Sequence, residues 1–218
     1  MEPEKNVKKS TQQRVLEKSA QLFNEFGIEA VSIGQIAKEL KISPGNLTYH
    51  FKRKADLISQ HLDALEDILP KTIEAIPVLS NARTFGAAYI DLLQLTREFR
   101  FLFIGANYLL QNDLVSEERY QRLIDKTKAS FLMQINRLVD AEMMSPIKTP
   151  YSASMLVDSI WWQWLGWLMA EQIEPGKHKI PEKKRLADAV LHIFFLNHHY
   201  VDPKFFRRLQ QELKTLGK

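Results

Sequence analysis

The spacing of apolar and polar residues predicts two short helices near the N-terminus. Apolar residues recur from Ile33 to Leu40 at i, i+3, i+4 and i+7, which is one face of a helix, and Ser32 stands where it can cap the first turn. Ser43 and Pro44 then start a second helix, because serine caps a first turn and proline suits the first helical position. The residues between leave room only for a tight turn.

The second of these helices has few side chains that must be buried. Only Leu47 and Phe51 are strongly apolar at helical spacing, so its other face is left to lie in a DNA major groove. The polar side chains there suit base edges and phosphates, and a basic run follows. Taken singly, each of them is more readily an ordinary surface residue. The candidate DNA-binding residues are Ser32, Gln35, Ser43, Pro44, Gly45, Asn46, Thr48, Tyr49, His50, Lys52 and Lys54.

This segment resembles the helix-turn-helix of the TetR family of bacterial regulators. The matching positions are Ser32, Ile36, Ala37, Ile42, Ser43, Gly45, Leu47, His50, Phe51, Lys54 and Leu57. Upstream, residues 13–26 followed by Gly27 are similar to the family's first helix. The resemblance implies an all-α protein with an N-terminal three-helix helix-turn-helix domain and a larger C-terminal helical domain for ligand binding and dimerisation. We place these domains at residues 1–54 and 55–218.

The sequence departs from the family pattern at two places. Leu40 and Lys41 stand where the family usually has alanine and glycine, so we expect Lys41 to adopt a positive φ angle. Thr48 replaces the usual tyrosine, which follows one position later as Tyr49. The pattern therefore leaves open which side chain reads which base.

Beyond residue 54 the pattern predicts helices throughout. A stripe from Ile58 to Leu69 predicts a helix over 55–69 that ends before Pro70 and links the helix-turn-helix to the rest of the chain. An apolar segment follows at 85–95, and further helices are expected over 117–144, 152–172 and 181–200. We find no alternating strand pattern and no internal repeat.

The last two predicted helices are apolar on all sides, which is unusual for a helix on the surface of a monomer. The resemblance to the TetR family implies that they build a four-helix interface between two copies of the chain. The alternative is that their tryptophans fill the core of one copy. The candidate interface residues are Ile160, Trp164, Leu165, Leu168, Val190, Ile193 and Phe194.

Aromatic residues around position 100 outline a candidate binding site for an apolar or aromatic small molecule. The candidate ligand-binding residues are Phe99, Phe103, Tyr108 and Trp161. Plain core packing is the alternative for each of them. As implied by the resemblance, such an effector would act on a dimeric repressor that binds a pseudo-palindromic double-stranded DNA operator, although activation in place of repression stays open.

The distribution of charge agrees with DNA binding. The net charge is +4, and residues 1–54 alone hold ten Lys or Arg and six Glu, so the rest of the chain is neutral. Part of this charge lies in an arm formed by Lys5, Lys8 and Lys9. The alternative to a DNA-binding regulator is a helical interaction or scaffolding module whose basic end binds RNA or a protein.

Other classes of protein are disfavoured. Cysteine is absent, and we find no catalytic motif, no metal site and no cofactor motif, so we expect no enzyme activity. The polar N-terminus and the lack of a long apolar run predict neither a secretory signal nor a membrane span. We therefore expect a cytoplasmic protein.

Overall fold

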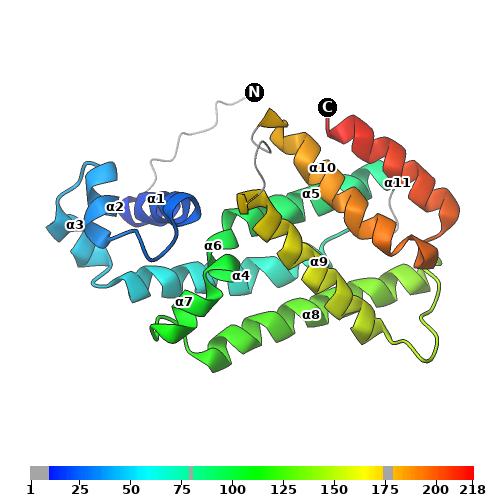
Figure 1. Cartoon of the computed structure of the whole chain (residues 1–218), viewed down its shortest axis with the longest axis horizontal. Coiled ribbons are helices and arrows are strands. Elements are labelled where there is room, and N and C mark those ends of the chain that lie inside the picture. The colour runs from blue at the N-terminus through cyan, green and yellow to red at the C-terminus, as the bar shows by residue number, and fades with distance from the viewer. Residues whose placement is uncertain (1–9, 79–80, 174–178) are drawn as a thin grey trace, which may run out of the picture. The chain divides into compact units, whose positions relative to one another are not determined.

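The structure is a computed structural model that describes residues 10–78, 81–173 and 179–218, and its regular elements there are helices (Figure 1). This confirms the predicted all-α class. The helices are α1 (Thr11–Phe26), α2 (Ile33–Glu39), α3 (Pro44–His50), α4 (Lys54–Glu74), α5 (Ala82–Glu98), α6 (Arg100–Ile104), α7 (Ala106–Gln111), α8 (Glu117–Asp140), α9 (Ala153–Ile173), α10 (Glu182–Leu196) and α11 (Pro203–Leu216), with a short 3-10 turn at His198–Tyr200.

The chain forms two compact units. The N-terminal unit contains the residues up to Ala64 together with Glu98–Glu117, and the C-terminal unit contains Leu65–Arg97 together with Glu118–Lys218. The boundary that we expected between residues 54 and 55 therefore lies inside the N-terminal unit. The first part of α4 and all of α6 and α7 belong with the N-terminal helices.

Asn24 on α1 explains why α6 joins the N-terminal unit. Its side-chain amide donates to the Glu98 carbonyl over 2.7 Å, and its side-chain oxygen accepts from the Phe101 backbone N–H over 3.1 Å. The Arg100 guanidinium donates to the Asn24 carbonyl over 2.9 Å. Beside these bonds the Phe23 and Phe101 rings pack with centroids 5.3 Å apart. Polar and apolar contacts thus fix α6 on α1.

Helix α4 does not end at Pro70, contrary to the prediction. It continues to Glu74 with Pro70 inside it, although an internal proline removes one backbone hydrogen bond and costs about 3 kcal/mol. The buried stripe explains the continuation, because Leu69, Ile73 and the following Ile76 are all at most 1% exposed. Burying a leucine or isoleucine contributes roughly 1.5–3 kcal/mol each, which offsets the proline.

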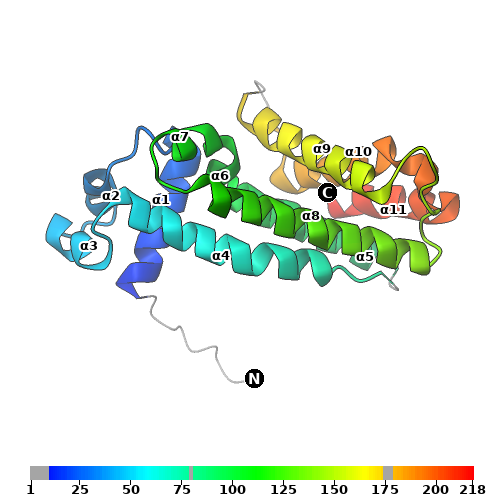
Figure 2. The ribbon, with the colours of Figure 1, turned by 90° about the horizontal axis from the view of Figure 1, so that it is seen from below.

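In the C-terminal unit, α8 runs beside the second part of α4 (Figure 2). Arg119 donates to Glu66 over 3.0 Å, and about three turns further along α8 Ser130 donates to Glu74 over 3.0 Å. Helix α8 ends at Asp140, not near Met144 as expected. Helix α10 likewise ends at Leu196, four residues earlier than expected, and passes into the 3-10 turn.

Helix α11 was not predicted, although the sequence carries its signals. Asp202 caps it by accepting from the Phe205 N–H over 2.7 Å, and Pro203 stands at its first position. Leu209 and Leu213 on its apolar face are fully buried. They meet α5 at Gly86, where a Cβ atom would come within 3.2 Å of both leucines. The missing side chain at Gly86 lets the two helices approach closely.

Candidate nucleic-acid interface

The predicted pair of short helices is present and is capped at both starts. The Ser32 hydroxyl accepts from the Gln35 N–H over 3.2 Å, while the Gln35 side chain accepts from the Ser32 N–H over 2.7 Å. At α3 the Ser43 hydroxyl accepts from the Asn46 N–H over 3.2 Å. These caps satisfy backbone donors that a helix start leaves unpaired, so α2 and α3 begin at defined residues.

The turn between the helices depends on one residue with a left-handed backbone. Lys41 has a φ angle of +54°, as predicted from the absence of the usual glycine. This lets the Ile42 N–H reach back to the Ala37 carbonyl over 3.1 Å, which closes the end of α2. The short turn fixes the direction in which α3 leaves α2.

Helix α3 is anchored at two positions and exposed elsewhere. Leu47 is 0% and the following Phe51 1% exposed, whereas Tyr49 is 84% exposed. Asn46 and His50 are exposed as well. The Tyr49 and His50 rings meet edge to face with centroids 5.2 Å apart. The exposed face of α3 therefore carries side chains that can donate and accept hydrogen bonds, and the buried Leu47 and Phe51 hold the helix in place.

The structure divides the candidate DNA-binding residues into two groups. The side chains of the first group already bond to the protein itself: Ser32, Gln35, Ser43, Thr48 and Lys54. The second group is exposed and makes no side-chain hydrogen bond to the described part of the chain: Pro44, Gly45, Asn46, Tyr49, His50 and Lys52. The side chains able to meet a base edge are therefore Asn46, Tyr49 and His50.

Lys54 differs most from expectation. Its ammonium donates to the Ile28 carbonyl over 2.7 Å and more weakly to the Glu29 carbonyl over 3.4 Å. The same ammonium lies 5.9 Å from the centre of the Tyr108 ring on α7. Partial burial lowers the pKa of Lys54, and the charge of Glu29 opposes that effect. Lys54 thus ties three segments of the N-terminal unit together.

Other basic side chains near α3 remain exposed. Lys38 lies in the last turn of α2, Lys41 lies in the turn between the helices, and Lys52 follows α3. Arg53 is 78% exposed at its side chain and lies 3.6 Å from Asp56. Arg53 was not among the candidate residues, although it is part of the same basic run. The predicted basic arm at Lys5, Lys8 and Lys9 lies outside the described residues.

Comparison with known proteins identifies the family. The profile of "Bacterial regulatory proteins, tetR family" matches residues 15–60, and that of "Bacterial transcriptional repressor", a TetR profile, matches residues 58–209. The chain belongs to the TetR family. Both profiles describe regulatory proteins, so the family of this chain is one of transcriptional regulators and not of enzymes.

Relatives and solved structures agree with this assignment. An HTH-type transcriptional regulator of Staphylococcus aureus strain USA300 is 49% identical over 49 residues, which are 22% of this chain and 26% of that protein. The chain thus matches about a quarter of the length of such curated relatives. A TetR-family regulator of Marinobacter aquaeolei VT8 has the same fold, with a TM-score of 0.74, 21% identity, and 95% of this chain and 99% of that chain covered.

Two further solved structures have lower similarity. GusR of Salmonella enterica is 17% identical with a TM-score of 0.59, covering 97% of this chain and 98% of its own. SmeT, the repressor of the Stenotrophomonas maltophilia multidrug efflux pump SmeDEF, is 16% identical with a TM-score of 0.59, covering 91% and 94%. At these identities the comparison concerns the fold alone.

Among the helices of the described residues, none has the length and apolar character of a membrane span.

The candidate ligand-binding residues are not gathered in one place. Phe99, Phe103 and Tyr108 belong to the N-terminal unit, where the Phe99 ring packs against His61, whereas Trp161 belongs to the C-terminal unit. None of these four side chains lines a cavity that we describe here. They pack against their neighbours in this structure, and their role in ligand binding stays a prediction.

Most candidate interface residues are already covered within one chain. The buried ones are Trp164, Leu168, Val190, Ile193 and Phe194, whereas Ile160 and Leu165 are half-buried. The Trp164 indole donates to the Thr96 hydroxyl over 3.0 Å, which fixes it inside the C-terminal unit. Their role between two chains is untested.

A different set of α9 residues is exposed. The stripe of Met155, Ser159, Trp162, Gly166, Met169 and Ile173, which we call the α9 stripe, repeats every three or four residues along one helix face. The sequence does not single out the α9 stripe, because α9 is apolar all round and its pattern does not indicate which face packs against the rest of the same chain.

Proposed function

We propose that this TetR-family protein is a repressor that binds a pseudo-palindromic operator as a homodimer and leaves it when a small molecule binds the C-terminal unit. The observation that supports DNA reading is the exposed face of α3, with Asn46, Tyr49 and His50 on a helix fixed by Leu47 and Phe51. A double-stranded operator is the partner that such a helix suits, because its width and its polar side chains match a major groove. In this proposal the protein works in the bacterial cytoplasm.

The α9 stripe supports the homodimer. Trp162 is 66% and Ile173 67% exposed, and Met155 and Met169 are exposed on the same face of the helix. An apolar face of this kind marks an interaction site. A second copy of the chain presents the same face, so a two-fold arrangement covers both at once and places two α3 helices on two half-sites.

Operator binding can be tested with variants of Asn46 and Tyr49, two of the exposed side chains of α3. We expect Asn46→Ala and Tyr49→Ala to change the ranking among operator sequences, since each removes a contact to a base edge worth about 1–3 kcal/mol. The measurement is a competition of fluorescent DNA duplexes drawn from the region upstream of the gene against single-base variants.

The matched control for that experiment is Gln12→Ala, on the exposed part of α1, which should leave the ranking unchanged. Among the described residues, the Gln12 side chain bonds to Gln60, over 2.9 Å. An unchanged ranking for both α3 variants would show that α3 does not read the bases. Equal displacement by unrelated DNA or by RNA would favour a general nucleic-acid-binding module.

A further inference from the structure

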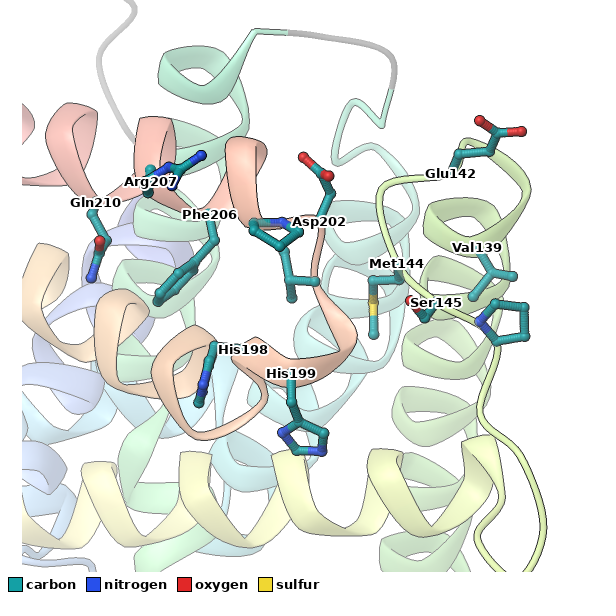
Figure 3. Close-up of a pocket in the computed structure, with 13 residues that line it drawn as sticks. Val139, Glu142, Met144, Ser145, His198, His199, Asp202, Phe206, Arg207 and Gln210 are labelled. Atoms are coloured by element: carbon teal, nitrogen blue, oxygen red, sulfur yellow. The ribbon is translucent and has the colours of Figure 1, made fainter.

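Two neighbouring cavities in the C-terminal unit differ in size and in chemistry. The first, which we call the outer cleft, has a volume of about 810 Å³ and opens to solvent between α11 and the segment after α8. Figure 3 shows Phe206 and Arg207 of α11 across the cleft from Glu142 and Ser145, with the side chain of Met144 between them. The second, the inner chamber, has a volume of only about 30 Å³.

The inner chamber is closed and apolar. It lies among α5, α8, α9 and α10, and the described residues that line it include no charged side chain. Phe131, Leu138 and Phe194 form much of its apolar wall. A charged ligand would lose its hydration there without a partner, so the lining suits an uncharged molecule.

Two polar groups in this wall can still bond to a ligand. No hydrogen bond of the Tyr89 hydroxyl is found among the described residues, although Tyr89 is only 8% exposed. Burial raises the pKa of Tyr89, so its hydroxyl keeps its proton and can donate. The Asn197 amide donates to the Ile193 carbonyl over 2.7 Å, which leaves the Asn197 side-chain oxygen as an acceptor.

Met144 and Val201 separate the two cavities, because both residues line each of them. They face each other in an isolated antiparallel bridge, which we call the clasp. The Ser145 N–H donates to the Tyr200 carbonyl over 2.7 Å, and the Asp202 N–H donates to the Met143 carbonyl over 2.9 Å. Two backbone hydrogen bonds therefore hold together the two segments that lie between the outer cleft and the inner chamber.

We propose that the inner chamber is a binding site for an uncharged aromatic molecule with one hydroxyl or carbonyl group, which enters from the outer cleft when the clasp opens. The inference that this molecule is the effector of the repressor rests on the function proposed above, whereas its binding does not require DNA. The chamber must widen, because an apolar cavity that takes up benzene has a volume of about 150 Å³. Met144 is suited to this movement, since its unbranched side chain repacks readily.

The clasp offers a direct test of the entry route. The chain contains no cysteine, so the double substitution Met144→Cys and Val201→Cys introduces a single possible disulfide. The two residues do not bond to each other's backbone, and in an antiparallel pair this places their Cα atoms close enough for a disulfide. Oxidation locks the clasp and reduction releases it.

The probe is 2-naphthol, an uncharged aromatic molecule with one hydroxyl group, and binding is measured by equilibrium dialysis. We expect the reduced double variant to bind it at least tenfold more tightly than the oxidised one. The single variant Met144→Cys, which cannot form this disulfide, should show no dependence on the redox state. Equal affinity in both redox states of the double variant would overturn the proposed route.

The polar contact is tested by Tyr89→Phe. This variant should bind 2-naphthol roughly threefold to tenfold more weakly, as expected for the loss of one hydrogen bond, and should bind naphthalene as well as the natural chain does. Unchanged binding of 2-naphthol would overturn the role of Tyr89. Binding of the anion 2-naphthoate at least as tight as that of 2-naphthol would overturn the uncharged chamber and indicate the outer cleft near Arg207.

A separate measurement distinguishes the site from the function. Operator affinity is compared with and without 2-naphthol, using the natural chain. If the locked clasp blocks binding of 2-naphthol but 2-naphthol leaves operator affinity unchanged, the binding site is upheld. The role of the inner chamber as effector site is then contradicted.

Discussion

The residue with the most unusual environment is His61 in the N-terminal unit. It is 5% exposed, and its Nε2 lies 2.8 Å from the Ser19 hydroxyl, which itself donates to the Leu16 carbonyl over 2.9 Å. Ser19 therefore accepts from His61, which assigns the proton to Nε2. The ring packs edge to face against Phe101 with centroids 5.1 Å apart. Burial lowers the pKa of His61 to about 4, so the residue is neutral in the folded protein.

This environment predicts that the protein loses stability in mild acid. Because the folded pKa of about 4 lies below the ordinary value of 6.5, protonation favours the unfolded chain. The free energy of unfolding should be unaffected by His61 above pH 6.5 and should fall as the pH decreases toward 4, by up to about 3 kcal/mol. Urea unfolding at several pH values between 7 and 4 measures this loss.

The control for that measurement is His61→Gln, which keeps a donor for Ser19 but does not titrate in this range. Its free energy of unfolding at pH 7 sets the baseline, and its decline between pH 6.5 and 4 should be smaller than that of the natural chain. Parallel pH profiles for the two proteins would contradict the role given to His61.

Lys54 and Lys52 provide a second prediction at this scale. Lys54 bonds to the Ile28 and Glu29 carbonyls, whereas Lys52 is exposed. Lys52→Met should reduce the slope of log affinity against log salt concentration by about one, as loss of a phosphate contact does. Lys54→Met should leave that slope nearly unchanged and should lower the melting temperature of the protein.

The measurement for both lysine variants is operator affinity at several salt concentrations, together with thermal unfolding without DNA. A reduced slope for Lys54→Met at an unchanged melting temperature would show that Lys54 contacts phosphate. This outcome would restore the assignment that the sequence suggested.

At the scale of single elements, α9 shows how one helix serves two purposes. Its buried side, including Trp161, Trp164 and Leu168, contributes to the core of the C-terminal unit. The opposite side is the α9 stripe. The buried side is covered within one chain, whereas the α9 stripe stays exposed, and an exposed apolar face of this kind marks an interaction site.

The α9 stripe therefore predicts different outcomes for exposed and buried positions. Trp162→Glu should convert the dimer to a folded monomer and weaken operator binding, because the new carboxylate stays solvated in the monomer but loses water in the dimer. Val190→Glu, at a position that is 0% exposed, should instead unfold the C-terminal unit. Analytical ultracentrifugation and far-UV circular dichroism measure both effects. A dimer that persists in Trp162→Glu would show that the interface lies elsewhere.

At the scale of the whole molecule, the regulation proposed above requires a connection between the two units. The chain passes between them after Ala64, after Arg97 and after Glu117. The first passage lies within α4, which continues through it without interruption from Lys54 to Glu74. A helix transmits displacement along its axis because its backbone hydrogen bonds resist bending, so α4 is suited to carry a displacement from one unit to the other.

The energy needed for such regulation is modest. A hundredfold loss of operator affinity corresponds to about 2.7 kcal/mol of preference of the ligand for the arrangement that does not bind DNA. This is comparable to the burial of one large apolar side chain.

The sequence by itself determined the helix-turn-helix in detail. The serine caps at Ser32 and Ser43, the proline at the start of α3 and the positive φ at Lys41 all follow from interactions within a few residues, which a local pattern contains. A capping residue and a proline, Asp202 and Pro203, also mark the start of α11, although this helix was not predicted. Helical periodicity and the resemblance to the TetR family together predicted the all-α class.

Only the tertiary structure decided how each helix face is covered. It placed the aromatic residues of α6 against α1, extended α4 past Pro70, bound Lys54 to two carbonyls and left the α9 stripe exposed. It also assembled the inner chamber from four helices that are far apart in the sequence. These features depend on which faces meet across long stretches of chain, and periodicity shows that a face is apolar without showing what covers it.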